Sequence, residues 1–159
     1  MGLHRKWPIR AAPPGGTVTY RFTASAPGTY LYASGTDPVY ERARLVKDGT
    51  TPTHTLTSYY RPEDVEGTPL VNPTAGPAGR GGGFAVLTLQ GLEPDTITES
   101  LHARMPTPAE TEQLQLPKGE PVVVLKRTTS TREGRIVEFA RGVHAGSRFE
   151  WTYTFKMPD

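Results

Sequence analysis

Two closely spaced arginines are the residues of this sequence best suited to bind a small charged molecule. Arg42 and Arg44 stand two positions apart in a segment with strand character, so both side chains should project from the same face of a sheet. A guanidinium group stays charged, and its planar fork donates two hydrogen bonds to one phosphate or carboxylate group. Such a pair has the chemistry that a phosphate or carboxylate site needs. Two solvated arginines on an edge strand are the alternative.

Two further charged residues are expected on the apolar sides of strands. Arg127 shares its parity with Val123 and Leu125, and Glu99 lies on the apolar side of residues 97–105. A charge that is buried without a partner is strongly unfavourable, so each of these groups needs a pocket or an ion pair. A Glu99–Arg127 pair that only holds two strands in register is the alternative to a ligand contact.

Catalytic and metal-binding patterns are weak in this sequence. It contains no cysteine, which excludes thiol catalysis and cysteine-ligated zinc. The four histidines, at positions 4, 54, 102 and 144, have no metal-ligand spacing. His54, His102 and His144 could each act as a general base, but no Ser-His-acid or paired-carboxylate spacing accompanies them. We therefore expect neither an enzyme nor a metal or cofactor.

Length and composition indicate one small soluble domain. The chain has 159 residues with 17 Gly and 16 Pro, which favours many turns and short elements over a helix bundle. No apolar run reaches the ~18 residues of a membrane span, and the basic start lacks the apolar segment of a secretory signal. A cytoplasmic location is expected. The net charge is +2 and the arginines are scattered, which is not the pattern of a DNA-binding domain.

Alternating polar and apolar residues predict hairpins in the first half of the chain. Expected strands cover residues 17–23, 29–33, 39–47 and 53–60, with a tight turn at Asp48-Gly49 between the last two. Residues 71–83 have the Pro, Gly and Ala content of a loop. Residues 84–90 fit either a helical turn or a short strand, with a slight preference for helix.

The second half predicts four strands and one helix. Strands are expected over residues 97–105, 122–129, 136–144 and 148–155. Thr107 and Glu110 form a capping-box pattern around Pro108, which starts a helix that should run to about Leu116. Hairpins with a single clear helix indicate an α+β fold with an antiparallel sheet and few flanking helices.

Three stretches of the sequence resemble the UTRA domain of HutC-type regulators in the GntR family of transcription factors. They are YERARLVKDGTTPTHTLTSYYRPED (residues 40–64), TESLHARMPTPAETEQLQLPKGEPVVVLKRTT (residues 98–129) and GRIVEFARGVHAGSRFEWTYTF (residues 134–155). They occur in the family's order between about residues 39 and 155. The resemblance implies a chorismate lyase-like antiparallel sheet that binds a small effector molecule, often a sugar phosphate or carboxylate, and a homodimer.

The resemblance also implies roles for particular residues. Arg42 and Arg44 match a basic strand that contributes to phosphate binding, and Glu138 matches a glutamate that contacts the ligand. Ser58 and Tyr60 offer hydroxyl groups at the end of a strand, and His144 stands where sugar-phosphate sensors of the family commonly carry Tyr. The expected ligand-binding residues are Arg42, Arg44, Ser58, Tyr60, Glu99, Arg127, Glu138 and His144. His144 in place of Tyr, and Leu56 in place of an acidic contact, argue against a hexosamine phosphate.

The beginning of the chain departs from the family. The winged helix that should bind DNA does not precede the sensing domain, so DNA contact is expected only through a missing region. Residues 7–38 instead resemble a multicopper oxidase cupredoxin segment, with Ala33 in the position of a copper-ligating histidine. We divide the chain into residues 1–38, as a gene-fusion remnant or as strands completing the sensor sheet, and residues 39–159, as a truncated UTRA-like domain.

Two other functions stay open at the level of sequence. The domain could be a structural or dimerisation fragment that binds nothing, or a chorismate lyase-like enzyme. The likeness of a fold does not by itself establish an activity.

Overall fold

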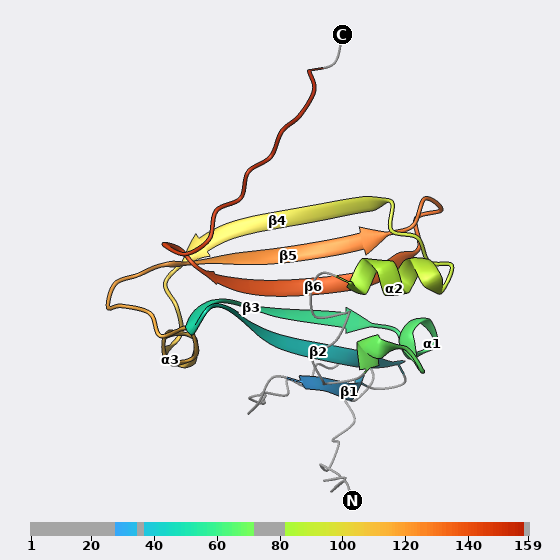
Figure 1. Cartoon of the computed structure of the whole chain (residues 1–159), viewed down its shortest axis with the longest axis horizontal. Helices are drawn as coiled ribbons and strands as arrows, with labels where there is room; N and C mark the ends of the chain where they lie inside the picture. Colours follow the sequence, from blue (N-terminus) through green and yellow to red (C-terminus); the bar gives the residue numbers. More distant parts are fainter. Residues whose placement is uncertain (1–27, 35–36, 72–81, 158–159) are drawn as a thin grey trace, which may run out of the picture.

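Six antiparallel strands form a single sheet in the computed structural model, which describes residues 28–34, 37–71 and 82–157 (Figure 1). The strands lie in the order β1-β2-β3-β6-β5-β4. Their bounds are β1 (Gly28–Ser34), β2 (Asp37–Asp48), β3 (Thr51–Tyr60), β4 (Thr96–Arg104), β5 (Val122–Ser130) and β6 (Ile136–Ala145). The helices are α1 (Pro62–Val65), η1 (Pro69–Val71, a 3-10 turn), α2 (Gly83–Leu89) and α3 (Pro108–Leu114). The α+β class with an antiparallel sheet is confirmed.

Local sequence signals explain most of these elements. The β2–β3 hairpin turns at Gly49, whose φ of +58° is a left-handed conformation that a glycine adopts without strain. Residues 84–90, for which the sequence slightly favoured a helical turn over a strand, lie almost entirely in helix α2. The capping box of α3 is present, with Thr107 Oγ accepting from the Glu110 N–H and the Glu110 carboxylate accepting from the Thr107 N–H. The expected strand at 17–23 and most of the expected loop at 71–83 lie outside the described residues.

β1 extends the sheet at its β2 edge. Its residues pair with Asp37–Ala43 of β2 over the whole length of the strand. The boundary expected between residues 38 and 39 therefore falls within paired strands of one sheet. Residues 1–27, which include most of the cupredoxin-like segment, lie outside the described residues. None of the described helices is long and apolar enough to span a membrane.

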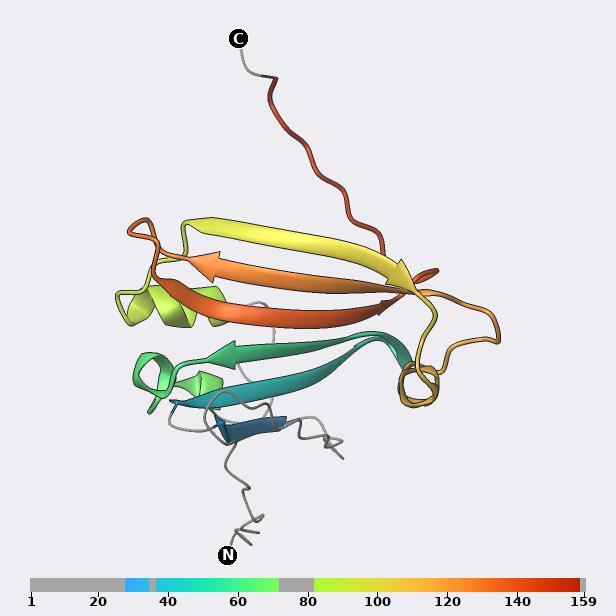
Figure 2. The ribbon, with the colours of Figure 1, turned by 180° about the vertical axis from the view of Figure 1, so that it is seen from behind.

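The expected last strand over residues 148–155 is wrong. After β6 the chain turns and runs as an extended segment that leaves the sheet beyond β4, without a ladder partner in the described part of the chain (Figures 1 and 2). The reason is that β6 is already flanked by β3 on one side and β5 on the other. A strand that follows β6 can therefore not form a hairpin with it.

The pairing register divides the residues between the two faces of the sheet. Because side chains alternate along a strand and directly paired residues share a face, Arg42, Arg44 and Arg127 all lie on the same side. We call this side the arginine face and the opposite side the far face. Arg141 and Lys126 pair with each other on the far face.

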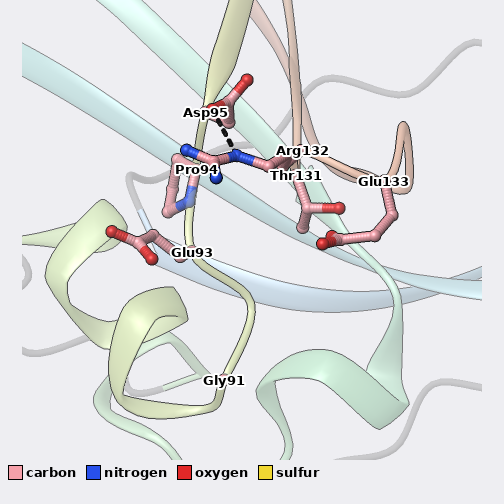
Figure 3. A pocket seen from close by; sticks show the side chains of 7 residues that line it. All are labelled: Gly91, Glu93, Pro94, Asp95, Thr131, Arg132 and Glu133. Carbon is pink, nitrogen blue, oxygen red and sulfur yellow. Dashed lines mark ion pairs between the residues drawn. The ribbon is translucent and has the colours of Figure 1, made fainter.

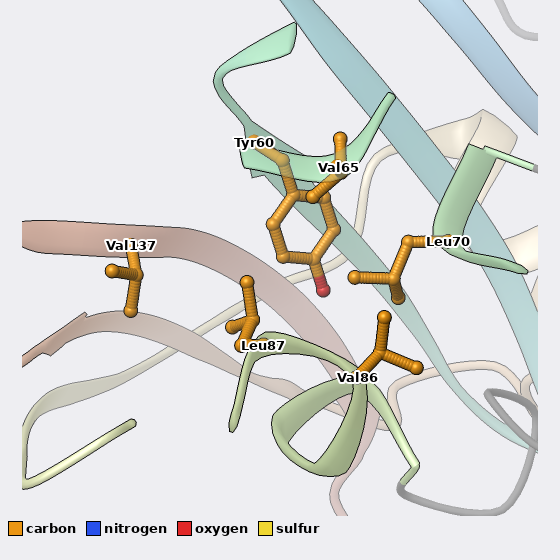
Figure 4. Packing of buried hydrophobic residues seen from close by; sticks show 6 residues of the cluster. All are labelled: Tyr60, Val65, Leu70, Val86, Leu87 and Val137. Atoms are coloured by element: carbon orange, nitrogen blue, oxygen red, sulfur yellow. The ribbon is translucent and has the colours of Figure 1, made fainter. Parts of the chain in front are cut away.

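Each face has an apolar cluster at one end of the strands. On the arginine face, α1, η1 and α2 pack over the end of β3, and their cluster consists of Tyr60, Val65, Leu70, Val86, Leu87 and Val137 (Figure 4). On the far face, α3 packs at the other end with a cluster of Leu114, Leu116, Val122, Val143 and Ala145. The middle of the arginine face is left to the charged residues.

The apolar side of β4 is not a core surface, contrary to the expectation for residues 97–105. Ile97 and Leu101 lie on the arginine face with 48% and 40% of their surface exposed. β4 is the edge strand of the sheet, and α2 does not reach along it. The alternation of β4 therefore predicted its orientation but not its burial.

Candidate functional site

One row of paired residues runs across five strands of the sheet. Arg42 of β2 pairs with Ser58 of β3, which pairs with Ala140 of β6; Ala140 pairs with Arg127 of β5, and Arg127 with Glu99 of β4. Directly opposed side chains in antiparallel strands lie about 5 Å apart at Cβ. The structure places all the predicted site residues on the arginine face: Arg42, Arg44, Ser58, Tyr60, Glu99, Arg127, Glu138 and His144.

Glu138 is the centre of a buried hydrogen-bond network beside this row, and it pairs with Thr129. Its side chain is 3% exposed, and Tyr60 donates its hydroxyl hydrogen to Glu138 Oε1 over 2.8 Å. Arg127 Nη2 donates to Oε2 over 3.3 Å, and Thr129 Oγ1 donates to Oε2 over 3.4 Å. Burial, together with the Glu138 carboxylate, raises the pKa of the Tyr60 phenol, so that it stays a donor. The network fixes the carboxylate in the middle of the arginine face.

Arg127 stands between two carboxylates and an aromatic ring. Its Nη1 lies 3.8 Å from Glu99 Oε1, and its guanidinium carbon lies 5.3 Å from the centre of the Phe84 ring of α2. Its Nε is buried and has no hydrogen-bond partner within the described part of the chain. The predicted Glu99–Arg127 ion pair is present, and the arginine keeps one buried donor to offer.

Arg44 is the second partly buried arginine of the face. Its Nη2 donates to Ser58 Oγ over 2.7 Å, and its buried Nε has no partner among the described residues. Burial lowers the pKa of this guanidinium. Arg42, on the same strand, is 5% exposed. The two arginines are therefore not solvated edge residues, since β1 covers the other edge of β2 and both side chains are withdrawn from water.

His144 lies on the arginine face four residues beyond the row along β6, in an aromatic cluster. Its ring stacks on His54 of the neighbouring strand, with 4.5 Å between ring centres and 17° between planes. Phe149 and Trp151 pack against it at 4.4 and 4.6 Å. Burial first, and then the neighbouring His54, lower the pKa of His144 to about 4. The imidazole is therefore neutral at neutral pH.

Gly142 makes room for this ring. A Cβ atom at Gly142 would lie 2.4 Å from the Cε1 atom of His144. His144 therefore leans along its own strand over the glycine, which fixes where the ring points.

The segment after β6 contributes a further contact to the row. Tyr153 donates its hydroxyl hydrogen to Glu99 Oε2 over 2.5 Å, so the same carboxylate receives Arg127 and Tyr153. The tyrosine is half exposed. The chain beyond residue 148 thus crosses the arginine face from β6 to β4.

A surface hollow of about 310 Å³ lies elsewhere, where the segment before β4 passes the β5–β6 turn (Figure 3). Asp95 and Arg132 face each other in it at 3.7 Å. It is lined by Gly91, Glu93, Pro94, Asp95, Thr131, Arg132 and Glu133. None of these residues was predicted to bind a ligand. Among the residues that the structure describes, no three acidic or histidine side chains gather as a metal site would require.

The sequence model of the UTRA domain matches residues 29–150. The chain belongs to the UTRA domain family. It is 59% identical over 143 residues to an uncharacterised HTH-type transcriptional regulator of Streptomyces coelicolor, SCO4628. The match covers 90% of this chain and 53% of the regulator, so the UTRA domain described here spans about half the length of that relative.

Solved structures with the same fold are regulators of the GntR family. One is a GntR-family regulator from Enterococcus faecalis V583, with a TM-score of 0.65, 15% identity and coverage of 77% of this chain and 84% of that one. Another is the C-terminal domain of the histidine utilization repressor of Pseudomonas syringae, with a TM-score of 0.61, 19% identity and coverage of 76% and 81%. These likenesses confirm the fold. The comparisons give no support to the cupredoxin likeness of residues 7–38.

Three aromatic residues beside the candidate site were not predicted from the sequence, and a fourth, His54, was named only as a possible general base. His54, Phe149, Trp151 and Tyr153 all contact predicted site residues. The alternation of residues 149–155 was visible in the sequence, but it predicted a strand within the sheet. His54 lies directly opposite His144 because β3 pairs with β6. Since these two strands are not consecutive, the sequence alone does not reveal this contact.

Proposed function

We propose that this UTRA domain is the effector-sensing part of a GntR-family transcriptional regulator, and that it binds a small anionic metabolite on the arginine face. The observation that carries the proposal is the pair of Arg44 and Arg127, each with a buried Nε that has no partner within the described chain. A buried donor without an acceptor costs about 1–3 kcal/mol, which a bound oxyanion would recover. The ligand class is a sugar phosphate or a small carboxylate.

The carboxylates beside the two arginines already have donors. Glu138 accepts a hydrogen bond from Tyr60, and Glu99 accepts one from Tyr153. The buried Nε–H groups of Arg44 and Arg127 are without an acceptor in the described chain and are suited to phosphate or carboxylate oxygens of a ligand.

The relationship to a helix-turn-helix regulator supports a place in transcription. We propose that DNA is contacted by a winged helix outside this chain, that the regulator acts as a homodimer in the cytoplasm, and that the domain is not an enzyme. The relatives named above are regulators. His144, the most buried histidine of the face, is enclosed by rings and held neutral, which suits packing better than proton transfer to a substrate.

Thermal shift with matched ligands tests the binding proposal. Sugar phosphates and small carboxylates are added one at a time, each beside its uncharged analogue. A ligand at 100 times its Kd stabilises the folded state by about 2.7 kcal/mol, which raises the midpoint by several degrees. We expect a shift with one class of anion and none with the neutral analogues.

Variants locate the response. Arg44→Ala and Arg127→Ala should abolish the shift, while Arg132→Ala, which removes an 86% exposed arginine of the separate hollow, should leave it unchanged. Arg127→Lys keeps the charge and loses the planar fork, so it should weaken the shift without unfolding the domain. If no anion stabilises the wild type, or if the two alanine variants respond as it does, the proposed site is wrong.

A further inference from the structure

The segment of residues 149–157 has the pattern of a strand but no strand partner in the described chain. We call it the C-terminal segment. Apolar residues occupy its odd positions, namely Phe149, Trp151, Tyr153, Phe155 and Met157, and polar residues occupy its even ones, namely Glu150, Thr152, Thr154 and Lys156. This period of two is typical of a strand with one buried side. The open question is what buries that side.

The first half of the segment buries its odd residues on its own sheet, and the second half does not. Phe149 and Trp151 pack on His144, and Tyr153 bonds to Glu99. Phe155 stacks on Tyr153 with 6.1 Å between ring centres, yet it is 81% exposed, and Met157 is 88% exposed. The segment runs out beyond β4 into solvent (Figures 1 and 2). Its outer half therefore presents large apolar side chains that the described part of its own chain does not cover.

The sequence of the segment is complementary to itself when it is read in the opposite direction. An antiparallel pair of two copies centred on Tyr153 sets Glu150 opposite Lys156 and Thr152 opposite Thr154. On the other side it sets Trp151 opposite Phe155. Opposite charges, two threonines and two aromatic rings are the cross-strand pairs that stabilise antiparallel strands. A two-fold axis through Tyr153 would form each of these pairs twice.

We propose that two copies of this chain associate by pairing their C-terminal segments antiparallel, with the two-fold axis at Tyr153. The proposal rests on the proposed homodimer and names its surface. The odd residues of each segment already face the arginine face of their own sheet. The pairing therefore brings Phe155 and Met157 of the second copy onto that same side, next to the aromatic cluster. It also supplies apolar side chains on the face where Ile97 and Leu101 are exposed.

This arrangement links the dimer to the ligand site. Glu99 accepts from Tyr153 at the centre of the pairing and lies 3.8 Å from Arg127. A ligand that takes Arg127 away from Glu99 would act on the contact nearest the two-fold axis. Ligand binding and the geometry of the dimer would then be coupled, with each affecting the other to the same extent.

Charge reversal at one pair tests the register. Sedimentation equilibrium of the full chain is measured for Lys156→Glu, which sets two glutamates opposite each other at both symmetry-related positions. We expect its dimer dissociation constant to rise roughly tenfold. The double variant Glu150→Lys/Lys156→Glu restores both pairs, and its dissociation constant should return to within about threefold of the wild type. Lys118→Glu, an exposed lysine after α3, is the control and should have no effect.

A single introduced cysteine tests the axis. The sequence has no cysteine, so Tyr153→Cys can form a disulfide only between copies. Residues on the two-fold axis are near enough for a disulfide, and we expect most of this variant to become covalent dimer under a mild added oxidant. In the proposed register, Thr152 of one copy lies opposite Thr154 of the other and only diagonally from the second Thr152. The variant Thr152→Cys should therefore cross-link poorly alone, but well when it is mixed with Thr154→Cys.

The outcomes separate the two proposals. A dimer by sedimentation with no effect of charge reversal and no preference for Tyr153→Cys would overturn the paired segment and leave the homodimer. A monomer at all concentrations would overturn both, while anion binding by the arginine face would still be decided by the thermal shift. Loss of dimer in Lys156→Glu without rescue in the double variant would show that the register is wrong.

Discussion

His144 is a buried histidine whose protonation would destabilise the folded state. Its ring is 2% exposed, stacked on His54 and enclosed by Phe149 and Trp151. Its Nδ1 is buried without a partner among the described residues. A positive charge there would be surrounded by rings and would face a second imidazole, that of His54, whose own pKa is lowered by burial and then by Arg44. The cluster therefore disfavours the protonated, positively charged form of the His144 imidazole.

The stability of the domain should consequently fall as the pH is lowered from about 6.5 to about 4. The pKa of His144 is about 4 in the folded state and near 6.5 in the unfolded chain, so the unfolded state binds more protons in this window. The contribution is fully present above pH 6.5 and is lost towards pH 4. Urea unfolding at several pH values measures it, and we expect a loss of about 2–3 kcal/mol from this residue.

The variant His144→Gln shows whether this residue is the cause. It removes the titrating group, so its unfolding free energy should fall much less between pH 6.5 and 4 than that of the wild type. Lys126→Gln, an exposed change on the far face, should keep the full pH dependence. An identical slope in His144→Gln and the wild type would contradict the assignment.

At the scale of elements, α2 connects the apolar cluster of the arginine face to the proposed ligand site. It packs Val86 and Leu87 against Tyr60 (Figure 4). The Tyr60 hydroxyl bonds to Glu138, and the ring of Phe84 lies under the guanidinium group of Arg127. The helix has no side-chain N-cap and is only two turns long. A helix this short is marginal in isolation, so packing rather than intrinsic propensity must hold it in place.

Two leucines of α2 give a matched test of this statement. Leu87 is fully buried, whereas Leu89, two residues along, is 83% exposed. Leu87→Ala should destabilise the domain by about 2–5 kcal/mol because it leaves a cavity below the helix. Leu89→Ala should change the unfolding free energy by less than about 0.5 kcal/mol. Chemical denaturation of both variants measures the difference, and equal effects would mean that the helix is not packed as described.

Helix α3, in contrast, is held by hydrogen bonds from an arginine at each of its ends. Arg104 forms two 2.7 Å hydrogen bonds with Glu110 in the capping box at the start of α3. The hydrogen bonds from Arg104 lower the pKa of the Glu110 carboxyl to about 2. At the far end, Arg148 donates to the carbonyls of Leu114, Gln115 and Pro52. Arg148 thereby joins the end of α3 to β3 and sets where the C-terminal segment begins.

At the scale of the whole molecule, apolar surface remains that a single copy does not bury. Among the exposed large apolar residues, Ile97 and Leu101 lie on β4 and Tyr153, Phe155 and Met157 lie on the C-terminal segment. Exposed apolar surface that is contiguous marks an interaction site in soluble proteins, and the proposed dimer would join these two groups. In the proposed dimer the folded state is stabilised by association, so its stability depends on concentration.

The thermal midpoint should therefore rise with protein concentration. We expect an increase of about 2–4 °C for each tenfold rise, measured by calorimetry between the micromolar and the hundred-micromolar range. A chain ending at Arg148 lacks the C-terminal segment and should show a midpoint that is independent of concentration. A constant midpoint for the full chain over this range would contradict a dimer that is coupled to folding.

The alternation of side chains along a strand predicted part of the site, but not all of it. Arg42, Arg44 and Ser58 could be assigned to one side from their spacing and from the β2–β3 hairpin, since parity and a tight turn are local properties. The capping box of α3 was predictable for the same reason. The row that joins Arg42 to Glu99 depends on β3 lying beside β6, which no local signal specifies. Only the structure shows that order.

By itself, the sequence determined the α+β class, the hairpins, the capped helix and the charges that share a face, because each follows from spacing along the chain. Only the tertiary structure decided that β6 has neighbours on both sides. It therefore also decided that residues 148–155 cannot form a hairpin with β6 and that Tyr153 meets Glu99 across the face of the sheet. The physical reason is that a strand has only two edges for backbone hydrogen bonds, and which strands occupy them is settled by packing between distant segments.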